Sequence, residues 1–140
     1  MPVIIVYFDM TIFNILDIKI KNIGKSPAKN IIVKIEPLNE IVNVKYLDKA
    51  SFIGKEIALL APDQFLKTTV GTLMEIKNSN GDYPVYSVSI YFKDLDENDY
   101  SKEYIIDANM YKGNVQVIDK NLHDLTKVAE KIESHIRKLT

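Results

Sequence analysis

Apolar and polar residues alternate along most of the first 110 positions of the chain. In 14–22, 31–35 and 86–92 every second position is apolar, and most of the positions between them are polar. This period of two is typical of a strand that buries one face. Runs rich in β-branched and aromatic residues predict further strands at Val3–Phe8 and Tyr100–Asp107.

Turn residues separate these segments. "LAPDQ" (60–64), "NSNGDYP" (78–84) and "KDLDEND" (93–99) are turn or loop signals, and the last of them predicts a hairpin. A short strand is expected at 65–70, and 41–47 and 51–60 are each either a strand or an irregular stretch. The spacing predicts an all-β sandwich of about seven strands.

The pattern changes over the last twenty residues. Apolar side chains recur at intervals of three and four residues, at Leu122, Leu125, Ala129, Ile132, Ile136 and Leu139. This spacing predicts an amphipathic helix. We therefore divide the chain into a sandwich at 1–113 and a helical segment at 114–140. Two roles stay open for the helix: packing on the sandwich, or self-association into a homo-oligomer through Leu125, Ile132 and Ile136.

The composition of the chain argues against a nucleic-acid partner and against cysteine-based sites. The 140 residues carry 18 basic and 19 acidic side chains, for a net charge of −1, and no Lys/Arg run. Such a balance gives no long-range attraction to nucleic acid, so no nucleic-acid partner is expected. The chain has no cysteine, which excludes disulfides and thiolate metal sites.

The N-terminal apolar run bears on localisation. Val3–Phe8 is far shorter than the ~20 residues of a membrane helix, and it lacks the flanks of a signal peptide. The chain nevertheless enters a strand-like run almost at once, which suggests that more chain precedes it. A membrane span upstream would tether the domain on the extracytoplasmic face; without one, a cytoplasmic location is expected.

The stretch "NIGKSPAKN" (22–30) contains two spellings of catalytic motifs. Gly24-Lys25-Ser26 ends like a P-loop, but Lys19 stands where the first glycine belongs, and a strand pattern follows where a helix is needed. Ser26-x-x-Lys29 lacks the companion triplets of serine hydrolases that use this motif. The turn reading explains the residues better, with Gly24 expected at positive φ.

Four stretches carry a resemblance to a known family. "IKIKNIGKSPAKNIIVKI" (18–35) resembles the passage from the second to the third strand of bacterial immunoglobulin-like domains, in particular the cell-adhesion-related domain found in bacteria. "LAPDQ" is similar to a turn of that group, and 85–107 resembles its final hairpin. The tail 110–132 is similar to that of uncharacterised bacterial proteins carrying this sandwich. The resemblance implies an immunoglobulin-like fold and a non-catalytic role, with no cofactor.

Two constellations could bind metal. Asp94, Asp96 and Asn98 open like a calcium loop, but Asp99 stands where glycine is required. An acidic hairpin turn is the simpler interpretation, with weak calcium binding as the alternative. His123 and His135 lie on different faces of the expected helix and cannot share one metal within a monomer. We therefore expect no catalytic and no metal-ligating residues.

The final hairpin is dense in tyrosine. Tyr91 lies opposite in phase to the apolar positions of its strand, and we expect it beside Tyr100 or Tyr104 across the hairpin. An exposed strip of rings offers large contact area at small entropic cost. Cross-strand pairing is the alternative explanation. The sequence thus predicts a non-enzymatic interaction or adhesion-type module whose partner is a protein or a glycan, with a structural or assembly module as the alternative.

Overall fold

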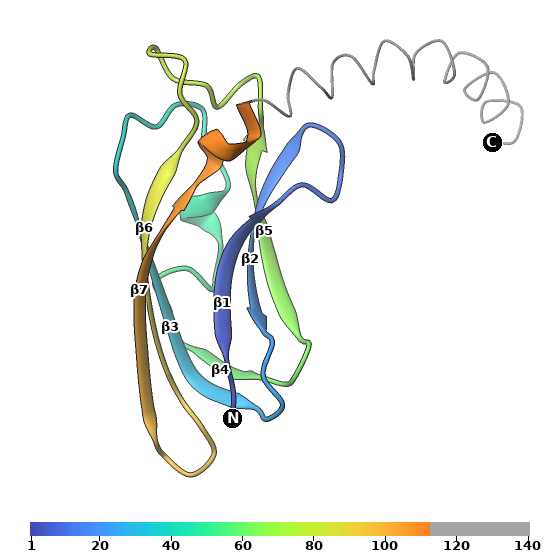
Figure 1. Ribbon diagram of the computed structural model, residues 1–140, viewed down its shortest axis with the longest axis vertical. Coiled ribbons are helices and arrows are strands. Elements are labelled where there is room, and N and C mark those ends of the chain that lie inside the picture. Colours follow the sequence, from blue (N-terminus) through green and yellow to red (C-terminus); the bar gives the residue numbers. More distant parts are fainter. Residues whose placement is uncertain (113–140) are drawn as a thin grey trace, which may run out of the picture. The chain divides into compact units, whose positions relative to one another are not determined.

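Seven strands in two antiparallel sheets make up most of the structure. The computed structural model describes residues 1–112 (Figure 1). One sheet has the order β1-β2-β5, with bounds Ile4–Asp9, Ile15–Asn22 and Phe65–Thr72. The other has the order β4-β3-β6-β7, with bounds Ile57–Leu60, Ala28–Pro37, Val85–Lys93 and Asp99–Asp107. Two short 3₁₀ helices, η1 (Leu47–Lys49) and η2 (Ala108–Tyr111), complete the described elements.

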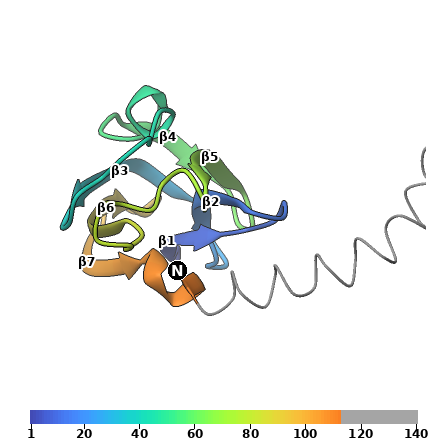
Figure 2. The same ribbon diagram turned by 90° about the horizontal axis from the view of Figure 1, so that it is seen from above.

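The two sheets form two layers around one apolar core. Seen from above, β1, β2 and β5 lie on one side and β3, β6 and β7 on the other (Figure 2). The inward positions of the strands are fully or nearly fully buried, including Leu16, Ile18, Ile20, Ile31, Val33, Tyr86, Val88, Ile90 and Phe92. These are the positions that the alternation assigns to the buried face. The predicted all-β sandwich of about seven strands is therefore confirmed at this level.

The segment between β3 and β4 differs from the simplest expectation. Residues 41–47 form no strand, and of 51–60 only Ile57–Leu60 is a strand. The backbone N–H of Gly54 donates to the carbonyl of Val33 at 2.9 Å, which holds this irregular segment beside β3. Leu47 is buried, so the segment contributes to the core without regular pairing.

The connection "NIGKSPAKN" carries the chain from one sheet to the other. Asn22 is fully buried there. Its side-chain carbonyl accepts from the N–H groups of Val3 (3.2 Å) and Gly24 (2.9 Å). Its amide donates to the carbonyls of Ser26 (2.9 Å) and Leu60 (3.0 Å). One side chain thus joins the N-terminal segment, the connection and β4.

The role expected for Gly24 is wrong. Its φ is not positive. A Cβ at this position would instead lie 2.3 Å from the carbonyl oxygen of Met1 and 2.5 Å from the nitrogen of Val3. Glycine is required because the N-terminal backbone passes against it.

Tyr104 closes the side of the sandwich between β1 and β7. Its hydroxyl accepts from the N–H of Val6 at 2.6 Å and donates to the carbonyl of Val6 at 2.7 Å. Both groups belong to the edge strand β1, where unpaired backbone would otherwise invite another strand. Burial raises the pKa of the Tyr104 phenol, while the bond to the Val6 backbone opposes that rise.

The structure does not test the predicted C-terminal helix or the role in association expected for its residues. The amphipathic helix and the segment 114–140 fall outside the described residues, and so do Leu125, Ile132 and Ile136. All seven strands belong to one compact unit, Met1–Asn109. Within residues 1–112, no helix has the length and apolar character needed to cross a membrane.

Candidate functional site

The outer face of the four-stranded sheet presents Tyr91 among small and charged residues. In the register of β6 and β7, Tyr91 lies opposite Ser101 and Ser89 opposite Glu103. On the other side, Tyr91 lies opposite Ile32 of β3. Because β6 is paired on both sides, this ring stands on a backbone fixed by two ladders. Tyr91 is 43% exposed, although it belongs to an inner strand.

A lysine, three serines and an isoleucine lie around the Tyr91 ring. The ammonium of Lys34 lies 5.9 Å from the ring centroid, within the range of a cation–π contact. Serines at 87, 89 and 101 are short, so the ring projects above the sheet beside them. Ile105, on the same face of β7, is 62% exposed. The face therefore combines two exposed apolar side chains with a lysine and hydroxyls.

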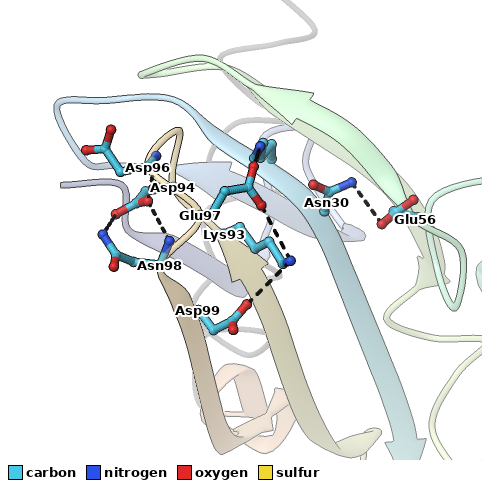
Figure 3. A network of polar contacts seen from close by, with 9 residues as sticks. Asn30, Glu56, Lys93, Asp94, Asp96, Glu97, Asn98 and Asp99 are labelled. Atoms are coloured by element: carbon cyan, nitrogen blue, oxygen red, sulfur yellow. Dashed lines mark hydrogen bonds and ion pairs between the residues drawn. The ribbon is translucent and has the colours of Figure 1, made fainter.

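A hollow of about 410 Å³ lies next to Tyr91. It is lined by Asn30, Ile32, Glu56, Tyr91, Phe92, Lys93, Asp99, Tyr100 and Ser101. A β-bulge in β3 between Lys29 and Ile32 shapes one wall, where Asn30 adopts φ +51°. The Asn30 amide donates to the Glu56 carboxylate at 3.1 Å (Figure 3). This bond ties the bulge to the segment just before β4.

In the acidic turn between β6 and β7, the carboxylate of Asp94 accepts hydrogen bonds from neighbouring residues of the hairpin. One oxygen of Asp94 accepts from the N–H groups of Asp96 and Asn98, both at 2.9 Å. The other accepts from the Asn98 amide at 2.9 Å (Figure 3). It also accepts from the Tyr100 hydroxyl at 3.0 Å. The side-chain bond from Asn98 is the largest cause that lowers the pKa of Asp94. Asp94 thus organises the turn with the oxygens that a calcium ion would need.

Two further acids of the turn, Glu97 and Asp99, face lysines. Glu97 pairs with Lys29 and lies 3.6 Å from the Lys93 ammonium, and Asp99 lies 3.9 Å from the same ammonium. Such exposed pairs contribute little stability, but they offset the negative charge of the turn. In residues 1–112, no group of three or more His, Cys, Asp or Glu side chains is placed to hold a metal ion.

The three hairpin tyrosines do not form one strip. Tyr100 lies opposite Phe92 and Tyr104 opposite Val88, so both belong to the inward face, whereas Tyr91 points outward. The Tyr100 ring stacks on Phe92 with a centroid distance of 5.1 Å and an interplanar angle of 12°. The expectation that Tyr91 lies beside Tyr100 or Tyr104 across the hairpin is therefore wrong. Of the three, Tyr91 is the one exposed on the outer face.

The sequence did not predict that Asn30, Glu56 and Lys34 lie near Tyr91. Asn30, Glu56 and Lys34 come from β3 or from just before β4, far along the chain from Tyr91, and only the strand pairing brings them to it. Residues 1–112 contain neither His nor Cys. Among the described residues, the chemistry that this hollow offers is hydrogen bonding, ion pairing and contact with an aromatic ring.

A family model matches the part of the chain that the structure describes. The model of the family described as Domain of unknown function (DUF8453) matches residues 1–112. Comparisons with curated proteins and with solved structures found no match.

Proposed function

The chain belongs to the family described as Domain of unknown function (DUF8453), and for this member we propose a non-enzymatic, immunoglobulin-like module that binds a protein or glycan. Binding would take place on the outer face of the β4-β3-β6-β7 sheet, around Tyr91. The site would act through surface complementarity, without a cofactor.

Strand order supports the immunoglobulin-like part of the proposal. Lettered in chain order as A, B, C, C′, E, F and G, the strands give sheets A-B-E and C′-C-F-G. Immunoglobulin-like sandwiches likewise place A, B and E in one sheet and C, F and G in the other. The stretch 18–35, which resembles the passage between strands B and C of bacterial members, is also where this chain changes sheets.

The exposure of Tyr91 is the observation that carries the proposal. Hot spots of binding interfaces are enriched in tyrosine, because a ring gives a large contact area and loses few rotamers. Tyr91 is held on an inner strand and borders a hollow of about 410 Å³, a volume within the range of small-ligand pockets. One partner side chain or one sugar ring would fit there, with Lys34 and Ser101 beside it.

The test is a selection of ligands followed by matched variants. A displayed peptide library and a glycan array are screened against the immobilised protein, and the ligands obtained are titrated against Tyr91→Ser and Phe65→Ser. Phe65 is a close control: it is 46% exposed on the other sheet, and a lysine ammonium lies 4.7 Å from its ring centroid. We expect Tyr91→Ser to weaken binding at least about tenfold, or ~1.4 kcal/mol, and Phe65→Ser to leave it unchanged. Ligands that bind both variants equally, or the absence of any ligand, would contradict the proposal.

An assembly role is the second candidate. Strand β7 is a nine-residue edge strand whose side chains are mostly exposed, and such an edge can pair with another copy. The apolar positions Leu125 and Ile132, which the sequence predicts on one face of a helix, are the other route to association. Light scattering on Leu125→Asp/Ile132→Asp and on the parent chain tests the helical route: an unchanged monomer mass in both removes it, and a mass that falls in the variant supports it.

A further inference from the structure

A second and larger hollow, of about 660 Å³, lies at the three-stranded sheet. Its walls come from the beginning of β2, from β5, and from residues 43–46. The Asn43 amide donates to the carbonyl of Glu75 at 2.8 Å, and the Thr68 hydroxyl donates to that of Tyr46 at 3.5 Å. These bonds hold the irregular segment against β5 and the turn that follows it, so the hollow has a defined wall on that side.

A bulge in β5 shapes the floor of this hollow. Leu16 pairs with Gly71 and Asp17 with Thr69, so β5 has one extra residue at this point. Gly71 adopts φ +154°, and a Cβ there would meet Ile76 at 2.6 Å. Glycine is therefore required, which makes the bulge a specified feature of the fold.

Asp17 is a buried carboxylate in the lining of the hollow. It is 3% exposed, and no described residue donates a side-chain hydrogen bond to it or forms an ion pair with it. The nearest cation along its strand, Lys19, is bonded to Asp9 at 2.6 Å and interacts with Asp17 only by electrostatic attraction without an ion-pair contact. Buried carboxylates are normally paired and hydrogen-bonded, because leaving the charge uncompensated costs free energy. Asp17 thus offers acceptor oxygens that the described part of the chain does not use.

The charges of the lining, with Asp17 included, are balanced. Lys45 and Lys67 supply two cations, and Glu75 and Asp17 supply two anions. No described acid forms an ion pair with either lysine. Lys67 is two residues from Thr69 along β5, so it lies diagonally across from Asp17 on the same sheet, with a backbone separation of about 7–8 Å. A ligand with a single charge would be repelled by the lining residues of the same sign. A ligand that carries one positive and one negative group can pair with a carboxylate and with a lysine of the lining.

We propose that this hollow binds a small zwitterion of the α-amino acid class. The ligand's ammonium group donates to Asp17, and its carboxylate accepts from Lys67 and Lys45. Its side chain lies against the apolar part of the lining, which Ile12, Ile15 and Tyr46 provide. The site is on the sheet opposite to Tyr91, so this inference does not rest on the function proposed above.

The experiment is calorimetric titration of the full chain with the twenty free amino acids, each raised to about 10 mM. We expect at least one to bind with a Kd below about 1 mM. Its N-acetyl derivative, which lacks the ammonium, and its methyl ester, which lacks the carboxylate, should bind at least about tenfold more weakly. This comparison uses only the unmodified chain, so it does not depend on the folding of a variant. Binding of no amino acid, or equal binding of the N-acetyl derivative, would overturn the proposal.

Variants then place the ligand in the hollow. Asp17→Asn keeps the shape of the side chain and removes its charge, and we expect it to weaken binding at least about 30-fold. Lys67→Gln should weaken binding less, and Lys102→Gln, an exposed lysine of the other sheet, should leave it unchanged. The thermal midpoint of ligand-free Asp17→Asn should equal or exceed that of the parent, because an unpaired buried charge has been removed. A midpoint that falls sharply would instead show a structural anchor, and unaltered affinity in Asp17→Asn would place the ligand elsewhere; either result overturns the proposal.

Discussion

Replacing Asn22 by alanine removes four hydrogen bonds at once. The side chain is fully buried, and two of its bonds are donated and two accepted. After the substitution, the N–H groups of Val3 and Gly24 and the carbonyls of Ser26 and Leu60 lose their partner. The bond to Leu60 lies in the interior, while the other three are partly buried, so water can replace some of what is lost.

The magnitude follows from these four bonds. A typical hydrogen bond contributes about 0.5–1.5 kcal/mol net, and a buried group left unsatisfied costs about 1–3 kcal/mol. Allowing for water at the partly buried groups, we expect Asn22→Ala to lower the free energy of unfolding by about 3 kcal/mol. With an m-value of about 1.5 kcal/mol/M, the urea midpoint falls by about 2 M. For a chain of this size the thermal midpoint falls by about 10 °C.

The assay is equilibrium urea unfolding followed by circular dichroism, with Asn80→Ala as the matched control. Asn80 is exposed and belongs to a loop, so its substitution should change stability by less than about 0.5 kcal/mol. If Asn22→Ala also loses less than about 1 kcal/mol, the four bonds do not tie the segments together, and our account of the "NIGKSPAKN" connection is refuted.

Three further outcomes are expected. Tyr104→Phe removes both bonds to Val6 and should cost about 1–3 kcal/mol in urea unfolding, whereas Tyr91→Phe should be neutral; equal effects would contradict the edge-closing role. Gly24→Ala should cost about 1–3 kcal/mol in the same assay, because its Cβ meets backbone, and an unchanged midpoint would contradict the close approach. The pKa of Asp94 is lowered in the folded chain, so its stabilising contribution is full above pH ~4 and is lost as pH falls through the folded value. The stability difference between the parent and Asp94→Asn should therefore shrink on acidification, and a difference independent of pH would contradict the closed turn.

Strands β2, β3 and β6 and their buried face could be predicted from the alternation alone. In 14–22, 31–35 and 86–92 the pattern is regular, and the inward residues are those that the period of two indicates. The segment 41–47 is apolar enough for a strand but is irregular, because its place beside β5 is decided by tertiary contacts such as those of Asn43 with Glu75 and of Thr68 with Tyr46. Local composition does not contain that information.

The candidate site was harder to predict because it depends on register. The five residues between Lys93 and Asp99 set the pairing of the final hairpin, and this pairing puts Tyr100 and Tyr104 on the inward face. A shift of one residue would have put both on the same face as Tyr91. The burial of Asp17 could not be predicted either. Its strand pattern assigns it to the polar face, and the segment 43–46, which lines the same hollow, comes from elsewhere in the chain.

The bond between Tyr104 and Val6 also bears on how the chain folds. It joins residues 98 positions apart, so closing the loop between them costs more chain entropy than any neighbouring-strand contact. We expect the rate-limiting step of folding to precede this contact. Tyr104→Phe should then accelerate unfolding and leave the refolding rate nearly unchanged, a φ-value near zero. The tyrosine would then bind the first strand only after the rate-limiting step. It would slow unfolding and so prolong the lifetime of the folded domain, without accelerating folding.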